Sequence, residues 1–183
     1  MKKLALILLI IVFSSCEKDP CKDVTCLNGS VCDDGSCLCL EGYGGRDCGT
    51  EIAPRLIYIS QIAAPRFPIK KADGKSWDSG AEALPDVYPI IIKNQTTEWT
   101  SKVHEIDADM YNLTAFTVNP MFEITDVKST YEIELYDYDF NEEDEFMGKV
   151  QFVPYQEGKN FPMQFTIDDG GEVAITISVF YLW

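Results

Sequence analysis

Apolar and polar residues alternate along most of the chain after residue 54. Side chains of a strand point alternately to its two faces, so this alternation is typical of strands with one buried face. The expected strands cover residues 55–59, 87–92, 99–103, 113–118, 122–124, 131–136, 149–153, 161–167 and 173–181. No segment here has a convincing helical period. About eight strands in roughly 130 residues predict an all-β, antiparallel sandwich.

The alternation stops between residues 63 and 85, and no helical pattern replaces it. This stretch is therefore expected to be one long loop. Long loops without secondary structure are uncommon inside compact domains and often carry function.

The first part of the chain has a different pattern. Residues 1–15 begin with two lysines, continue with an apolar run too short to span a bilayer, and end in two serines before Cys16. This order resembles the lipobox of bacterial lipoproteins, with Phe13 in place of the usual leucine. The resemblance implies a signal peptide over residues 1–15, followed by a diacylglycerol thioether and N-acylation (palmitate) at Cys16. The alternative is an ordinary secretory signal followed by a chance cysteine.

Acyl chains on Cys16 would attach the protein to a membrane, because two or three chains bind a bilayer stably. Residues 16–20 would form a short acylated tether. Glu17 and Asp19, beside the cysteine, resemble the export signal of surface lipoproteins in Bacteroidetes-type bacteria. The expected location is the cell envelope, at the outer membrane and facing the surface.

Six of the seven cysteines lie within residues 21–48. In an exported protein such a cluster predicts disulfides, and so short a segment needs them because it buries little core. A zinc site would require CxxC pairs or histidines, and the one histidine, His104, lies elsewhere. The spacing alone does not choose among the many ways of pairing six cysteines.

This segment resembles an EGF-like domain over its whole length. Residues 37–48 contain Cys-x-Cys-x-x-Gly-Tyr and then Gly-x-x-Cys, both at that family's positions. The resemblance implies a small two-stranded sheet and a role as spacer or protein-contact unit. It also implies the disulfides Cys21–Cys32, Cys26–Cys37 and Cys39–Cys48. Residues 17–20 depart from the acidic consensus of the calcium-binding subclass, so no calcium is expected in this module.

Acidic residues outnumber basic ones by 30 to 15, which gives a net charge of −15. Loss of Lys2 and Lys3 with the signal peptide would leave 13 − 30 = −17. A chain with this charge is not expected to bind nucleic acid or anionic lipid through bulk electrostatics, but it could attract divalent cations.

The negative charge is densest at residues 137–145, where six of nine residues are carboxylates. Asp137 and Asp139 end an alternating strand, so their side chains should point to the same side. Carboxylates this close repel each other unless a cation lies between them. Calcium fits best, because it is a hard cation that takes oxygen ligands. The alternative is an acidic tip that is merely solvated.

Two motifs give the second half of the chain a resemblance to a C2 domain, the calcium-dependent module that binds membranes and proteins. Residues 137–148 match that family's third loop and following strand, and residues 86–88 (Asp-Val-Tyr) resemble its first loop. The resemblance covers most of residues 54–183. It implies an eight-stranded sandwich whose calcium loops cluster at one end.

The resemblance also implies a set of calcium ligands drawn from both loops. The set is Asp78, Asp86, Asp137, Asp139 and Glu145, with Asp73 and Asp144 as alternates. Glu145 stands where the family usually has an aspartate, and the first loop is longer than the common pattern.

The sequence thus indicates a non-enzymatic, lipid-anchored envelope protein. Its EGF-like domain (21–48) would present a C2-like domain (54–183) that binds calcium and a phospholipid or protein partner. The alternative is a metal-independent structural or adhesive protein with a degenerate C2 domain. An enzyme is not expected, because the sequence offers no Ser-His-Asp or Cys-His set and no sign of a sugar cleft.

Overall fold

The computed structural model of the chain describes residues 18–78, 83–109, 111 and 114–183. The expected signal peptide and the acylation site at Cys16 lie outside these residues. The chain divides into two compact units, Met1–Gly49 and Thr50–Trp183. Within the described residues, no helix has the length and apolar character needed to cross a membrane.

Three disulfides hold the first unit together. They join Cys21 to Cys32, Cys26 to Cys37 and Cys39 to Cys48, which are the pairs that the EGF-like resemblance implies. Strands β1 (Val31–Asp33) and β2 (Ser36–Leu38) form an antiparallel hairpin, and a short β3 (Tyr43–Gly44) follows. Of the described residues in this unit, only Gly42 and Cys48 are buried. The crosslinks therefore replace a core that this unit lacks.

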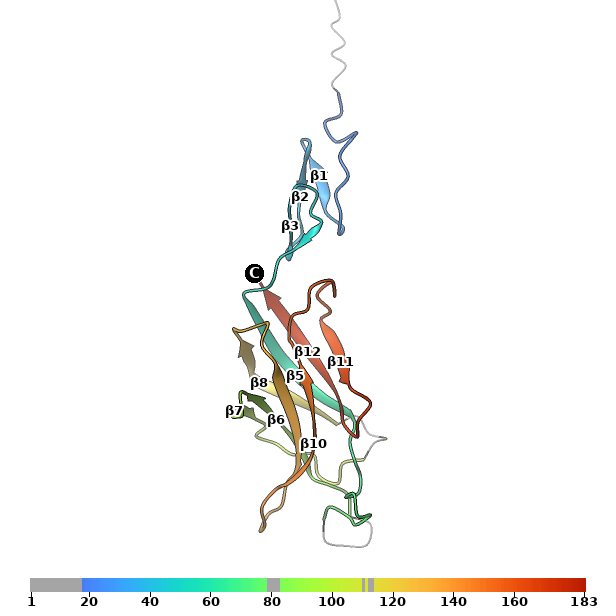
Figure 1. Cartoon of the computed structure of the whole chain (residues 1–183), viewed down its shortest axis with the longest axis vertical. Coiled ribbons are helices and arrows are strands. Elements are labelled where there is room, and N and C mark those ends of the chain that lie inside the picture. The colour runs from blue at the N-terminus through green and yellow to red at the C-terminus, as the bar shows by residue number, and fades with distance from the viewer. Residues whose placement is uncertain (1–17, 79–82, 110, 112–113) are drawn as a thin grey trace, which may run out of the picture. The chain divides into compact units, whose positions relative to one another are not determined.

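The second unit is an eight-stranded antiparallel sandwich, which confirms the all-β fold expected from the alternation. After the short β4 (Thr50–Glu51), its strands form two sheets in the orders β10-β9-β6-β7 and β11-β12-β5-β8 (Figure 1). The strands are β5 (Leu56–Arg66), β6 (Val87–Lys93), β7 (Thr96–Thr100), β8 (Thr114–Ile124), β9 (Tyr131–Asp137), β10 (Glu145–Phe152), β11 (Gln164–Asp168) and β12 (Ala174–Leu182).

The two sheets enclose one apolar core, and β9 shows how the sequence builds it. Alternate residues of this strand face inward, so Tyr131, Ile133 and Leu135 are buried while the residues between them are partly exposed. The same period places one more residue inside, and that residue is Asp137. The alternation that makes the core therefore also drives a carboxylate into the interior at the end of the strand.

The long loop is shorter than the sequence predicts. Residues 63–66 continue β5, so the loop expected over 63–85 begins only at Phe67. Residues 62–64 are all buried in a part of β5 that pairs irregularly with both neighbours: its register shifts against β8 between Ile59 and Gln61 and against β12 between Ala63 and Arg66. The period of two is lost there, although the strand itself continues.

Several other strand limits differ from the prediction: β10 begins at Glu145 rather than at 149, and β11 begins at Gln164 rather than at 161. The strands expected at 113–118 and 122–124 correspond to a single strand, β8, which begins at Thr114 and runs through Pro120. This strand lies at the edge of its sheet, where a proline is tolerated. The strand expected at 99–103 is β7, which starts earlier because residues 94–95, both at positive φ, form a two-residue hairpin turn.

Gly148 allows β10 to pass close to the chain that leads into β12. The pairing of β10 with β9 shifts register between Phe146 and Gly148, and a Cβ at position 148 would lie 2.6 Å from Val173 Cγ2. We expect Gly148→Ala to lower the free energy of unfolding by about 1–3 kcal/mol, measured by denaturant titration. In a Val173→Ala background the same change should cost less, because the clashing methyl group is gone. Equal costs in both backgrounds would contradict this steric origin.

Candidate metal centre

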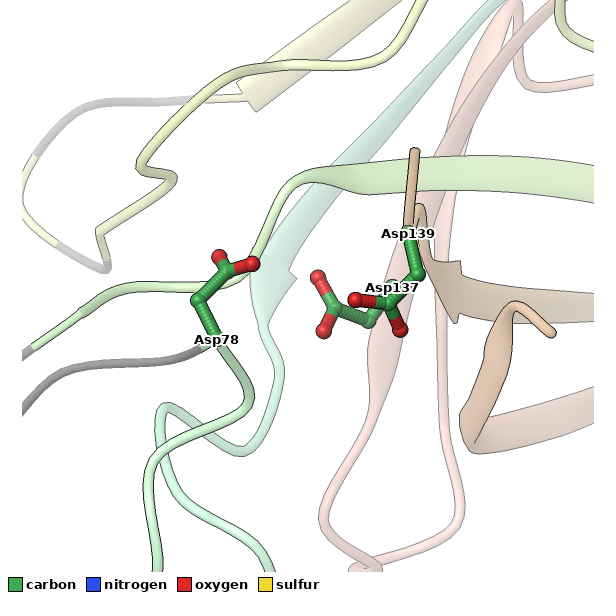
Figure 2. A group of neighbouring side chains, drawn as sticks. All are labelled: Asp78, Asp137 and Asp139. Carbon is green, nitrogen blue, oxygen red and sulfur yellow. The ribbon is translucent and has the colours of Figure 1, made fainter. Parts of the chain in front are cut away.

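Three carboxylates meet at one end of the sandwich. The loop before β6 and the loop before β10 both lie at this end (Figure 1). Asp78 comes from the β5–β6 loop, Asp137 is the last residue of β9, and Asp139 follows two residues later. Each offers a ligand oxygen, and these three oxygens lie within 4.8 Å of one another. Figure 2 shows the side chains pointing toward one another. Strand periodicity places Asp137 and Asp139 on the same side, and Asp78 completes the group from another loop.

Asp137 is the centre of this group. It is fully buried, and it is the one buried charged residue in the described part of the chain. Its Oδ1 accepts a hydrogen bond from the backbone N–H of Asp86 (2.6 Å), whereas its Oδ2 has no partner. Leaving such a polar atom unsatisfied in the interior costs free energy. The orphaned oxygen is thus a specific position at which a cation would be stabilising.

The pKa is raised in all three carboxyl groups of this site. Burial raises the pKa of Asp137 to about 7, and the neighbouring carboxylates Asp78 and Asp139 add to this shift. The pKa of Asp78 and that of Asp139 are also raised, in each case by burial first and then by nearby acidic groups. Nearby positive charge, from Lys71, therefore compensates the ionised group of three only in part.

Asp86 and Asp144 brace the site and stand outside the group of three. The Asp86 side chain accepts a hydrogen bond from the backbone N–H of Asp107 (2.9 Å), which fastens the β7–β8 loop. Asp144 accepts one from the Tyr88 hydroxyl (2.6 Å) and one from the backbone N–H of Asp139 (3.1 Å). Burial, followed by this contact with Asp144, raises the pKa of Tyr88, so its hydroxyl remains a donor.

Glu145 and Asp73 are each engaged by a lysine. Glu145 is the first residue of β10 and forms an ion pair with Lys71. Asp73 pairs with the Lys75 ammonium (2.7 Å) and accepts a hydrogen bond from the Lys75 backbone N–H (3.0 Å). The structure thus gathers three of the seven predicted ligands and gives the other four protein partners.

The sequence did not reveal the residues that bind the remaining carboxylates, above all Lys71, which pairs with Glu145, and Tyr88, which donates to Asp144. Lys71 is one of three lysines within residues 70–75, so the sequence did not single it out, whereas Tyr88 belongs to the Asp-x-Tyr motif. The group of three itself consists of carboxylates alone. Such an oxygen donor set suits a hard cation such as calcium, whereas zinc sites favour cysteine and histidine. Calcium takes six to eight oxygens, so backbone carbonyls, water or a partner would complete the shell.

Exposed apolar side chains lie on the loops beside this site. Phe140, in the β9–β10 loop, is 84% exposed, and Ile106, in the β7–β8 loop, is 66% exposed. The two loops are neighbours, because the ring of His104 stacks on that of Tyr138 with centroids 4.3 Å apart. The acidic end of the sandwich therefore also carries protruding apolar groups.

No family model matches the chain, and no curated protein does. Among solved structures, the first C2 domain of a plant Extended Synaptotagmin 1 is similar, with 15% identity over 72% of this chain and 97% of that one, and a TM-score of 0.44. Human GIVD cytosolic phospholipase A2 matches with 17% identity over 72% of this chain and 17% of that one, at a TM-score of 0.44. The paired C2 domains of Extended-Synaptotagmin 2 match with 21% identity over 71% and 42%, also at 0.44.

The raised pKa of Asp137 predicts how stability depends on pH without metal. A carboxyl with a pKa of about 7 when folded and about 4 when unfolded binds a proton on folding between these values. Stability conferred by the protonated form is therefore lost as the pH rises from about 4 to 7. Asp137→Asn should lack this loss and should exceed the wild type at pH 8 by on the order of 1–3 kcal/mol.

The measurement is denaturant unfolding between pH 5 and 8 in a metal chelator. Glu143→Gln is the control, because it removes one exposed carboxylate from the adjoining loop. Parallel pH profiles for wild type and Asp137→Asn would show that Asp137 does not titrate in this range.

Proposed function

We propose that the sandwich binds calcium through Asp78, Asp137 and Asp139. The observation that carries this proposal is the buried Oδ2 of Asp137, which has no hydrogen-bond partner and belongs to a group of three carboxylates. A divalent ion between these oxygens would replace mutual repulsion by attraction and satisfy the orphaned atom. The resemblance of residues 137–148, which include Asp137 and Asp139, to the third loop of a C2 domain also favours calcium.

The donor set favours weak binding. Among the described residues three carboxylates converge, and the four other predicted ligands, Asp73, Asp86, Asp144 and Glu145, are held by protein groups. Calcium modules outside cells commonly bind at about 10⁻⁴–10⁻³ M, a range that suits such a site. At a calcium concentration well above the Kd, the ion would stabilise the loops by mass action.

We further propose that the calcium-loaded end contacts a phospholipid surface. Calcium would offset the acidic charge that otherwise repels lipid phosphates, and an open coordination position could accept a phosphate oxygen. Phe140 and Ile106 would then bury apolar surface at the interface. A protein partner with a phosphate or carboxylate group is the other outcome that the vesicle experiment below can reveal.

The first unit and the N-terminus complete the proposal. The lipobox-like sequence favours acylation at Cys16 and an envelope location, with residues 16–20 as the tether. The EGF-like unit (21–48) would then act as a spacer between this anchor and the sandwich. Catalysis has no part in this proposal, in keeping with the sequence.

The alternative function is metal-independent adhesion by a degenerate C2-like domain. The pairing of Glu145 with Lys71 and of Asp144 with Tyr88 favours it, because these contacts already satisfy part of the acidic end without metal. The two functions differ in whether Asp137 and Asp139 matter for calcium-dependent properties.

Calorimetric titration of residues 17–183, which include every described residue, tests calcium binding. We expect saturable heat with a Kd of about 10⁻⁴–10⁻³ M and a rise in the melting temperature at millimolar calcium. The double variant Asp137→Asn and Asp139→Asn should lose both effects. Glu142→Gln with Glu143→Gln removes two exposed carboxylates from the same loop and should keep them. Absence of heat and of a thermal shift in the wild type would refute the calcium site.

Co-sedimentation with phosphatidylserine vesicles tests the lipid partner. We expect binding that requires calcium and that falls several-fold in Phe140→Ser, whose calcium affinity in solution should not change. Met163→Ser is the matched control, because Met163 is also exposed (62%) but precedes β11. Calcium binding without any vesicle binding would point to a protein partner instead.

A further inference from the structure

The β5–β6 loop carries a lysine whose backbone is held in place. The backbone N–H of Lys71 donates to the carbonyl of Lys75 (2.9 Å), and that of Gly74 donates to the carbonyl of Lys71 (2.8 Å). Gly74 has a φ of 83°, which glycine adopts without strain. A further hydrogen bond runs from Trp77 Nε1 to the carbonyl of Pro68 (2.8 Å). Lys71 therefore extends from a closed turn.

The side chain of Lys71 is positioned as well. Its ammonium forms an ion pair with Glu145 and lies 5.6 Å from the centroid of the Trp77 ring. Trp77 packs against the hydrophobic core, so the ring is a fixed surface for the lysine. The ammonium is only partly exposed, at 28% for the side chain. An ion pair with a second, aromatic contact holds its charge more firmly than a freely solvated pair.

Both contacts of Lys71 adjoin the three-carboxylate group. Asp78 directly follows Trp77 in the chain, and Glu145 pairs with Asp137 across the β9–β10 ladder. The charge of Lys71 accordingly acts on the site. It partly counters the rise in the pKa of Asp78 and of Asp139, and its own pKa is raised by Glu145 first and also by Asp137 and Asp139.

We propose that Lys71 is a tethered cation that competes with calcium for the acidic end of the sandwich. It would act in two ways, by repelling the ion and by holding Glu145 away from it. In the absence of metal the same ammonium would offset part of the carboxylate charge. This inference rests on the proposed calcium site and explains why Glu145, one of the predicted ligands, does not join the group of three.

The neighbouring lysines do not share this position. Lys75 pairs with Asp73 on the outer side of the turn, with its side chain 79% exposed. Lys70 is exposed and precedes Lys71 directly, so Lys70→Gln changes the net charge by the same amount at almost the same place in the chain. Lys70→Gln is therefore the matched control for the loss of the ion pair between Lys71 and Glu145.

The experiment compares calcium titrations of residues 17–183 as wild type, Lys71→Gln and Lys70→Gln. A unit charge close to a divalent ion at a partly exposed site weakens binding by roughly tenfold, so Lys71→Gln should tighten the Kd by about that factor. Lys70→Gln should change it by less than about twofold, because solvent and salt screen an exposed charge. Adding Glu145→Gln to Lys71→Gln should remove most of the gain, since the released carboxylate would then be missing.

A melt in chelator supplies a readout that needs no calcium. Lys71→Gln should lower the metal-free melting temperature by several degrees more than Lys70→Gln, and calcium should restore the difference. Adding Asp137→Asn to Lys71→Gln should abolish calcium binding, which places the gain at the three-carboxylate group.

The outcomes separate this inference from the function on which it rests. If the wild type binds calcium and Lys71→Gln binds it no more tightly than Lys70→Gln, the tethered cation is refuted and the calcium site stands. If Lys71→Gln binds calcium and the wild type does not, the tethered cation is supported and calcium binding by the wild-type protein is refuted, because Lys71 then blocks an otherwise competent site. If neither binds calcium, both are refuted.

Discussion

The inward-facing positions of β9 include one residue beyond its apolar side chains, and this residue is Asp137. The other groups at the acidic end of the sandwich are arranged around its carboxylate. Asp137 follows Leu135 on the buried face, so its carboxylate is enclosed by the same alternation that builds the core. One oxygen is satisfied by the backbone of Asp86, and the other has no partner. A buried half-satisfied carboxylate must be protonated, paired or coordinated to be stable, and this requirement gives the surrounding loops their role.

The surrounding acidic residues divide into two classes by their partners. Asp86, Asp144 and Glu145 are occupied by a backbone amide, a tyrosine hydroxyl and a lysine, and in this way they tie the loops to the sheet. Asp78 and Asp139 face Asp137 instead. Protein groups thus engage three of these carboxylates, whereas Asp78, Asp137 and Asp139 form one point of dense negative charge that Lys71 offsets only in part. Convergent carboxylate oxygens of this kind favour the binding of a small hard cation.

Strand periodicity carried most of the information about the fold. It identified the sandwich and the shared direction of Asp137 and Asp139, because both depend only on the two-residue repeat. It did not predict the strand limits where the alternation is interrupted, as at the consecutive buried residues of β5 and at Pro120 in β8. The disulfide pairs followed from the EGF-like resemblance, since the spacing of the cysteines left them open.

Strand periodicity could not predict which carboxylates converge and which are engaged by protein groups, because this depends on the conformation of the loops. Asp73 is followed by glycine, and its side chain accepts a hydrogen bond from the backbone N–H two residues later. This turn engages Asp73, and Asp78 is the carboxylate of this loop that reaches the group of three. The lysine that engages Glu145, by contrast, reaches it through a turn and a tryptophan that no alternating pattern encodes.

The ion pair between Lys71 and Glu145 changes how the two candidate functions relate to each other. An acidic end without such a cation would be strained in the absence of metal, and a stable metal-free sandwich would then speak against a calcium site. With Lys71 in place, part of the charge is already offset, so the sandwich can be stable without metal and still retain the unpartnered oxygen of Asp137. Metal-free stability therefore does not discriminate between adhesion and calcium binding. The discriminating property is whether Asp137 and Asp139 together change the response to calcium, because the ammonium can offset their charge but leaves the buried oxygen of Asp137 without a partner.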